Sequence, residues 1–151
     1  MDKFKEGLWR HMKPFQWRTL WLTHDKFIIG VTGVVLDDSK NVLLLRHTYW
    51  PEGSWGLPSG YAEHGEKLEK TLMREVKEET GYDVEVKKLL KLSSGYQLRL
   101  EVAYLGELTG GNLNIDSKEI LEAKFFSLDE IPQSLLESHK GLIEELRSSL
   151  K

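Results

Sequence analysis

The chain has 151 residues, of which 40% are hydrophobic and 30% charged, a composition typical of a soluble globular protein of one domain. Its net charge of -3 gives no basic field for double-stranded nucleic acid, and the absence of cysteine excludes disulfides and thiolate metal sites and favours a cytoplasmic location. No apolar run approaches the ~20 residues that span a bilayer, and charged residues interrupt any signal peptide at the N-terminus.

Residues 1–25 form an N-terminal extension in which aromatic and basic side chains are mixed. The apolar residues before Pro14 have the spacing of a short helix, which we expect the proline to end. After it, the rings of Phe15, Trp17 and Trp21 are predicted to pack on the rest of the chain or on the second subunit of a homodimer. Docking on a membrane surface or on nucleotides is the alternative. Residues 26–151 then form the main domain.

The main domain is predicted to open with a hairpin. Residues 27–36 are rich in valine and isoleucine, which is the pattern of a strand buried on both faces. Residues 37–41 have the composition of a turn, and residues 42–46 return as a second strand.

The loop after this hairpin, residues 47–55, carries candidates for substrate binding. Arg46 ends the second strand, and its planar guanidinium suits phosphate oxygens. The rings of Tyr49, Trp50 and Trp55 could stack on a base. We therefore predict substrate contacts from Arg46, Tyr49 and Trp55, with a surface role for the arginine and a core role for Trp55 as the alternatives.

A helix is predicted from residue 67 to residue 80. Its apolar residues recur at every fourth position, which gives a stripe that lies on a core: Leu68, Leu72 and Val76. Gly60 and Gly65 let the loop before the helix turn tightly and approach a ligand closely, and Gly81 is expected to end the helix in the left-handed conformation.

The last turns of this helix carry three neighbouring acids, Glu75, Glu78 and Glu79. Like charges at this spacing repel, and the helix dipole disfavours anions at a C-terminus. A bound hard cation would compensate, because carboxylate oxygens suit Mg²⁺ or Mn²⁺. The alternative is a solvated charged face on which Arg74 and Lys77 are the partners.

Beyond the helix, the sequence predicts further strands and a final helix. Strands are expected over residues 84–92, 98–107 and 119–126, with turns at 109–112 and 127–132. The final helix is indicated by apolar residues at helical spacing: Leu135, Leu142, Ile143, Leu146 and Leu150.

The glycines and acids stand in a pattern that resembles the signature of the Nudix hydrolases. The pattern is Gly, five residues, Glu, seven residues, then Arg-Glu-aliphatic-x-Glu-Glu-x-Gly-aliphatic, and it is filled in register by Gly60, Glu66, Arg74, Glu75, Val76, Glu78, Glu79 and Gly81. Tyr82 replaces the final aliphatic residue, and Ser59 replaces a glycine that usually precedes Gly60.

The resemblance implies a Nudix-like α/β/α sandwich with a central mixed β-sheet. It implies hydrolysis of a pyrophosphate linkage in a nucleoside diphosphate joined to another group, with Mg²⁺ or Mn²⁺ as cofactor. The metal would be held by Glu75, Glu78 and Glu79 with the carbonyl of Gly60. By the same resemblance Glu66 is supportive, and Arg74 holds the metal-binding glutamates in place.

The base that takes a proton from water differs among members of this family. The segment Glu119-Ile120-Leu121-Glu122 resembles the place where many Nudix enzymes carry an additional glutamate, which serves as a metal ligand or as this base. We predict Glu119 as the base, with Glu122 in reserve; the alternative for each is a surface carboxylate.

The substrate stays open at this stage. Family members that act on ADP-ribose typically carry a proline some fifteen residues after the signature, and this chain has none there. Nucleoside triphosphates, nucleotide sugars, CDP-alcohols and RNA 5′ ends all remain. A catalytically silent nucleotide-binding module is the alternative function, which the intact signature acids disfavour.

Overall fold

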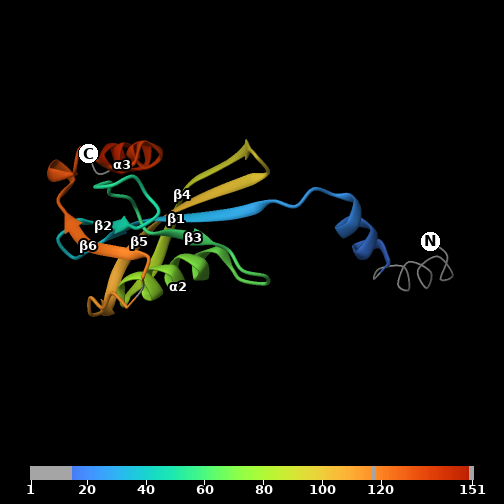
Figure 1. The fold of residues 1–151 in the computed structure, drawn as a ribbon, viewed down its shortest axis with the longest axis horizontal. Coiled ribbons are helices and arrows are strands. Elements are labelled where there is room, and N and C mark those ends of the chain that lie inside the picture. Colours follow the sequence, from blue (N-terminus) through green and yellow to red (C-terminus); the bar gives the residue numbers. More distant parts are fainter. Residues whose placement is uncertain (1–14, 117, 150–151) are drawn as a thin grey trace.

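The computed structural model describes residues 15–116 and 118–149 and shows a sheet between two helices (Figure 1). The strands are β1 (Ile28–Leu36), β2 (Val42–His47), β3 (Ser59–Tyr61), β4 (Tyr82–Tyr96), β5 (Arg99–Gly111) and β6 (Ile120–Phe126). The helices are α2 (Leu68–Thr80), the 3-10 turn η1 (Leu128–Glu130) and α3 (Glu137–Ser149).

The sheet is mixed, as the resemblance to the Nudix hydrolases implies. Its strand order is β4-β5-β1-β2-β6, and β3 pairs with β1 beside this path. Strands β1 and β5 run parallel, whereas the pairs β1 with β2, β2 with β6, and β4 with β5 are antiparallel. The predicted α/β/α sandwich with a central mixed sheet is therefore confirmed.

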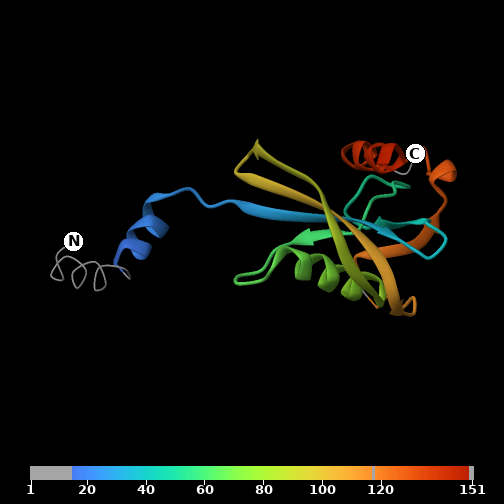
Figure 2. The ribbon, with the colours of Figure 1, turned by 180° about the vertical axis from the view of Figure 1, so that it is seen from behind.

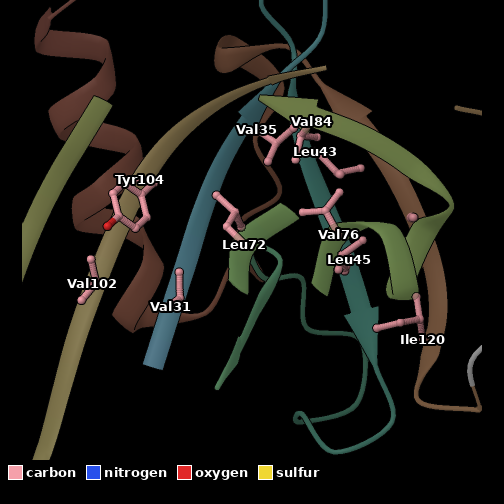
Figure 3. Packing of buried hydrophobic residues seen from close by; sticks show 11 residues of the cluster. Val31, Val35, Leu43, Leu45, Leu72, Val76, Val84, Val102, Tyr104 and Ile120 are labelled. Carbon is pink, nitrogen blue, oxygen red and sulfur yellow. The ribbon is translucent and has the colours of Figure 1, made fainter. Parts of the chain in front are cut away.

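Helix α2 packs on one face of the sheet through the predicted apolar stripe. Leu72 and Val76 are fully buried against Val31, Val35 and other residues of β1 and β2 (Figure 3). Gly33 lies directly beneath the helix, since a Cβ there would come within 2.4 Å of Leu72 Cδ1. This close approach fixes α2, and the acids it carries, against the middle of the sheet.

Helix α3 covers the other face. The alternate residues of β1 and β2 point to it, and the cluster includes Val34, Leu36, Val42, Leu44, Leu142, Ile143 and Leu146. Because alternate side chains of a strand point to opposite faces, the two clusters confirm that β1 is buried on both sides. Leu135 is buried just before α3, and Leu150 lies outside the described residues.

The predicted turn at residues 109–112 is wrong. Thr109, Gly110 and Gly111 continue β5, where Gly110 pairs with Asp83 and Gly111 with Tyr82 at the start of β4. A Cβ on Gly111 would lie 2.4 Å from the carbonyl oxygen of Gly81, so the glycine lets two chain segments meet at the end of α2. Gly81 has a φ of 77° and ends α2 as predicted.

The N-terminal segment extends away from the sandwich (Figures 1 and 2). Residues 15–23 are helical. The rings of Phe15, Trp17 and Trp21 are 69%, 72% and 68% exposed, so the prediction that they pack on the rest of the chain is wrong. That these rings pack on a second subunit stays a prediction. The short helix predicted before Pro14 lies outside the described residues. No helix in 15–116 and 118–149 is long and apolar enough to cross a bilayer.

Candidate active site

Gly60 brings strand β3 against the acids of α2. It pairs with Val31 of β1 in the sheet, and its Cα faces the helix. A Cβ at this position would lie 2.0 Å from the carboxyl carbon of Glu75. Any residue other than glycine would therefore displace that carboxylate, which explains in physical terms why the glycine stands here.

Arg74 organises the acids around it. Its Nη1 donates to Glu75 Oε1 at 2.8 Å and to Glu78 Oε2 at 3.2 Å, and its Nη2 donates to the carbonyl of Tyr61 at 3.1 Å. On its other side the guanidinium meets both oxygens of Glu66. One side chain thus links helix α2 to strand β3 and to the loop before the helix.

Glu66 holds Arg74 as a fully ionised partner. The hydrogen bond from Arg74, with further bonds from the hydroxyl of Thr71 and the backbone N–H of Glu63, lowers the pKa of Glu66 to about 2. The hydrogen bonds to Glu66 and then to Glu75 raise the pKa of Arg74. Both charges therefore persist at any pH near neutrality.

Glu79 differs from Glu66, because one of its carboxylate oxygens has no partner among the described residues and its pKa is raised. Its Oε2 is buried and has no hydrogen-bond partner within the described part of the chain. Burial, and then the charges of Glu75, Glu119 and Glu78, raise the pKa of Glu79 to about 8. Burial also raises the pKa of Glu75, against the pull of Arg74. A buried carboxylate without a partner is costly as an anion, so it takes up either a proton or a cation.

The acids do not form a preassembled metal site. Across 15–116 and 118–149, no three His, Asp or Glu side chains stand close enough together to hold a cation. Glu75 and Glu79 line the cavity described below, whereas the side chain of Glu78 is 61% exposed and turns to Arg74. Closing a ligand set around an ion would need Glu78 to rotate away from the arginine.

A cavity of about 1020 Å³ opens beside these acids. Its walls come from β1, β3, the loop after β2, helix α2, the β4 and β5 hairpin, and the start of α3. The volume is that of a pocket for a nucleotide-sized ligand. Among the predicted site residues it brings together Gly60, Arg74, Glu75, Glu79, Glu119 and Tyr49.

Glu119, the predicted base, lies in the same cavity as Glu75 and Glu79. It lines the cavity, its charge acts on Glu79, and its Oε2 lies 3.6 Å from Nε2 of His47. The backbone carbonyl of Glu119 accepts the N–H of Thr48 at 2.8 Å, which ties the start of β6 to the loop after β2.

Arg46 and Trp55 lie away from the cavity. Arg46 Nη1 pairs with Glu122 Oε2 at 3.3 Å, and the guanidinium stands 6.0 Å from the ring centroid of Trp55. None of these three residues lines the cavity, whereas His47, which follows Arg46 along the strand, does. Trp55 packs edge-on against Phe126 instead.

Several cavity residues carry no signal in the sequence. Lys91, Arg99 and Glu101 come from the β4 and β5 hairpin, and His139 comes from α3. Arg99 lies over the ring of Tyr61 at 5.3 Å. These residues lie outside the signature, so only the pairing of β5 with β1 and the docking of α3 reveal them.

Comparison with known proteins decides the family. A family model described as the NUDIX domain matches residues 26–146. The chain belongs to the Nudix family. The resemblance found in the signature is thereby confirmed, and with it the prediction of a Nudix hydrolase that acts on phosphorus anhydrides.

Two curated relatives are hydrolases of nucleotide-containing compounds. The ADP-ribose pyrophosphatase of Methanocaldococcus jannaschii is 30% identical over 124 residues, covering 79% of this chain and 73% of that protein. The NAD-capped RNA hydrolase NudC of an Enterobacter species is 34% identical over 105 residues, covering 68% of this chain. The alignment spans only 39% of the length of NudC.

Solved structures have the same fold. An ADP-ribose pyrophosphatase from Streptococcus suis matches with a TM-score of 0.64 and 27% identity, over 80% of this chain and 87% of that one. The NUDIX domain of Shewanella oneidensis NrtR, solved with ADP ribose, matches with a TM-score of 0.69 and 22% identity, over 89% of this chain and 98% of that one.

Proposed function

We propose that this Nudix hydrolase cleaves the pyrophosphate linkage of a nucleoside diphosphate joined to another group, and that it does so with a divalent cation. The observation that carries the proposal is Glu79, whose buried Oε2 has no hydrogen-bond partner among the described residues and which lines the cavity with Glu75 and Glu119. A cation at this carboxylate would remove the cost of burying its charge.

The residues present fit Mg²⁺ or Mn²⁺. The donors are carboxylate oxygens and a backbone carbonyl, which hard cations prefer, and the chain has no cysteine to favour a softer ion. Glu75, Glu78 and Glu79 would hold the metal with the carbonyl of Gly60. When bound, the metal would polarise a phosphoryl oxygen and lower the pKa of the attacking water.

The other residues prepare and complete the step. Glu66 keeps Arg74 in place, and Arg74 keeps Glu75 at the cavity wall. The carboxylate of Glu119 takes a proton from water, the water oxygen bonds to phosphorus, and the bond from phosphorus to the bridging oxygen breaks. The bridging oxygen leaves on the second phosphate, so the products are two phosphate monoesters.

ADP-ribose is the first substrate to test, because the relatives from Methanocaldococcus jannaschii and Streptococcus suis are ADP-ribose pyrophosphatases. The missing proline after the signature argues for a wider set. Nucleotide sugars, CDP-alcohols, nucleoside triphosphates and NAD therefore belong in the same screen. The cytoplasmic location and the homodimer stay predictions of the sequence.

The test is a screen of these compounds with and without Mg²⁺, read as release of phosphate or nucleotide. We expect the protein to hydrolyse at least one diphosphate compound. This turnover should require the metal and should be lost in Glu79→Gln. Tight nucleotide binding with no turnover of any compound would instead support the silent module. Turnover that persists in Glu79→Gln at the wild-type rate would refute the role of this carboxylate.

A further inference from the structure

His139, near the start of α3, is held in one neutral form. Its Nδ1 lies 3.0 Å from the backbone nitrogen of Leu57. A backbone N–H can only donate, so Nδ1 accepts, and the proton of the neutral ring must sit on Nε2. Burial lowers the pKa of His139 to about 4, which keeps the ring neutral in ordinary buffers. The Nε2–H group is therefore a permanent hydrogen-bond donor.

The residue that carries this donor is part of the cavity wall. His139 lines the cavity together with Leu142 of the same helix and Trp50 of the loop after β2. Within the described residues, the hydrogen bond of the His139 side chain is the one at Nδ1. The Nε2 atom is not one of the buried side-chain atoms that have no hydrogen-bond partner. The Nε2 atom is therefore reached by solvent, and a ligand can meet it.

Trp50 forms an aromatic wall beside this donor. The rings of Trp50 and His139 stand edge to face, with centroids 6.1 Å apart and an interplanar angle of 79°. Gly56 lies against Trp50, since a Cβ there would come within 2.5 Å of the indole ring. The indole therefore packs tightly on the backbone of its own loop, which restricts its movement.

We propose that this corner of the cavity binds the base of the nucleotide substrate. The base stacks on Trp50, and a ring nitrogen or carbonyl of the base accepts a hydrogen bond from Nε2–H of His139. This inference rests on the proposed function, since it names the part of the same substrate that this corner takes. An aromatic wall with an apolar neighbour, Leu142, suits a planar ring better than a phosphate, and a neutral donor adds no charge for an anion.

The chemistry of histidine offers a matched pair of variants. In His139→Asn, the side-chain carbonyl can take the place of Nδ1 and accept the N–H of Leu57, but no donor reaches the place of Nε2. In His139→Gln, the amide can take the place of Nε2, and the bond to Leu57 is lost. The first variant therefore removes the proposed ligand contact, and the second removes the contact within the fold.

The test compares AMP with ribose 5-phosphate, which share sugar and phosphate and differ by the base. Calorimetric titration of the wild-type chain should show AMP binding at least about fivefold more tightly, because base stacking is a substantial term. In His139→Asn that preference should fall by about twofold to tenfold, the effect of one hydrogen bond, with ribose 5-phosphate unchanged. His139→Gln should keep the preference and unfold at a lower temperature.

Trp50→Leu gives a second route if His139→Asn fails to fold. It should also reduce the preference for AMP and leave ribose 5-phosphate unaffected. Equal affinity of the wild-type chain for the two compounds would overturn the inference, as would an unchanged preference in His139→Asn and Trp50→Leu. Binding of AMP is measured without turnover, so a failure of the hydrolysis screen and a failure of the base site are read separately.

Discussion

Arg74 and Glu66 meet through two parallel hydrogen bonds, from Nε to Oε1 at 3.0 Å and from Nη2 to Oε2 at 3.1 Å. This geometry uses the planar fork of the guanidinium, which a lysine cannot reproduce. The remaining nitrogen, Nη1, is thereby aimed at Glu75 and Glu78. The pair therefore positions the nitrogen that holds Glu75, which lines the cavity.

We predict that Arg74→Lys lowers kcat/KM of the Mg²⁺-dependent reaction by about 10-fold to 100-fold, the usual cost of losing a residue that orients metal ligands. Arg147→Lys is the matched control, because Arg147 donates to the carbonyl of Leu128 near α3, outside the cavity. Steady-state kinetics on the substrate found in the screen measures both. Equal rates for the two variants would refute the role of Arg74.

Gly60→Ala should push the carboxyl group of Glu75 away from β3. The new methyl group would overlap the carboxyl group of Glu75, so we expect a lower melting temperature and loss of most metal-dependent turnover. Gly141→Ala is the control, because a Cβ there meets nothing within 4 Å and alanine suits a helix better. It should add about 0.5–1 kcal/mol to the free energy of unfolding. A Gly60→Ala protein with wild-type stability and rate would contradict the close packing.

Glu119→Gln tests the base. We expect kcat to fall by about 100-fold to 10,000-fold, the range for loss of a general base, with the metal still bound. Glu122→Gln should have a far smaller effect, because Glu122 pairs with Arg46 and does not line the cavity. Single-turnover rates of the two variants at saturating Mg²⁺ distinguish them. The reverse order of effects would make Glu122 the base.

The local patterns of the sequence predict much of this fold. Strand β1, strand β2, helix α2 and its cap at Gly81 all follow from residues close together along the chain. The turn predicted at 109–112 is wrong because Gly110 pairs with Asp83, and Gly111 pairs with Tyr82 beside Gly81. No local pattern in the sequence indicates these contacts. Partners distant in sequence outweighed the turn propensity of Gly110 and Gly111.

The candidate site was predictable only in part, for the same reason. Glu75, Glu78 and Glu79 share one helix, so their spacing alone predicts that they are neighbours on α2. Alternate residues of a strand share a face, so Arg46 lies on the same face of β2 as Leu44, the face that α3 covers. On that face it lies near Trp55 and Glu122 instead of the cavity. The hydrogen bond between Leu57 and His139, which lines the cavity, joins residues 82 apart in sequence, so no local pattern predicts it.

The pKa of Glu79 predicts how the stability of the metal-free protein depends on pH. In the folded chain this pKa is raised from 4.5 to about 8, so the folded state keeps a proton that the unfolded chain releases over this range. The contribution to stability is therefore fully present below pH 4.5 and is lost as the pH rises to 8.

Urea unfolding between pH 4.5 and 8, with a chelator present, measures this dependence. Glu79→Gln should flatten it without abolishing it, because the pKa of Glu75 is raised too and acts in the same direction. Added Mg²⁺ should stabilise the wild-type protein most at high pH, where Glu79 is ionised. Identical pH profiles for the wild type and Glu79→Gln would show that this carboxylate titrates normally.

Calorimetric titration of Mg²⁺ into the protein at pH 7, repeated in buffers of different ionisation enthalpy, tests most directly whether a divalent cation replaces the proton on Glu79. Because the pKa of Glu79 is about 8, we predict that binding to the wild type releases close to one proton, and that Glu79→Gln binds more weakly with little proton release. Equal affinity and equal proton release in the two proteins would contradict the prediction.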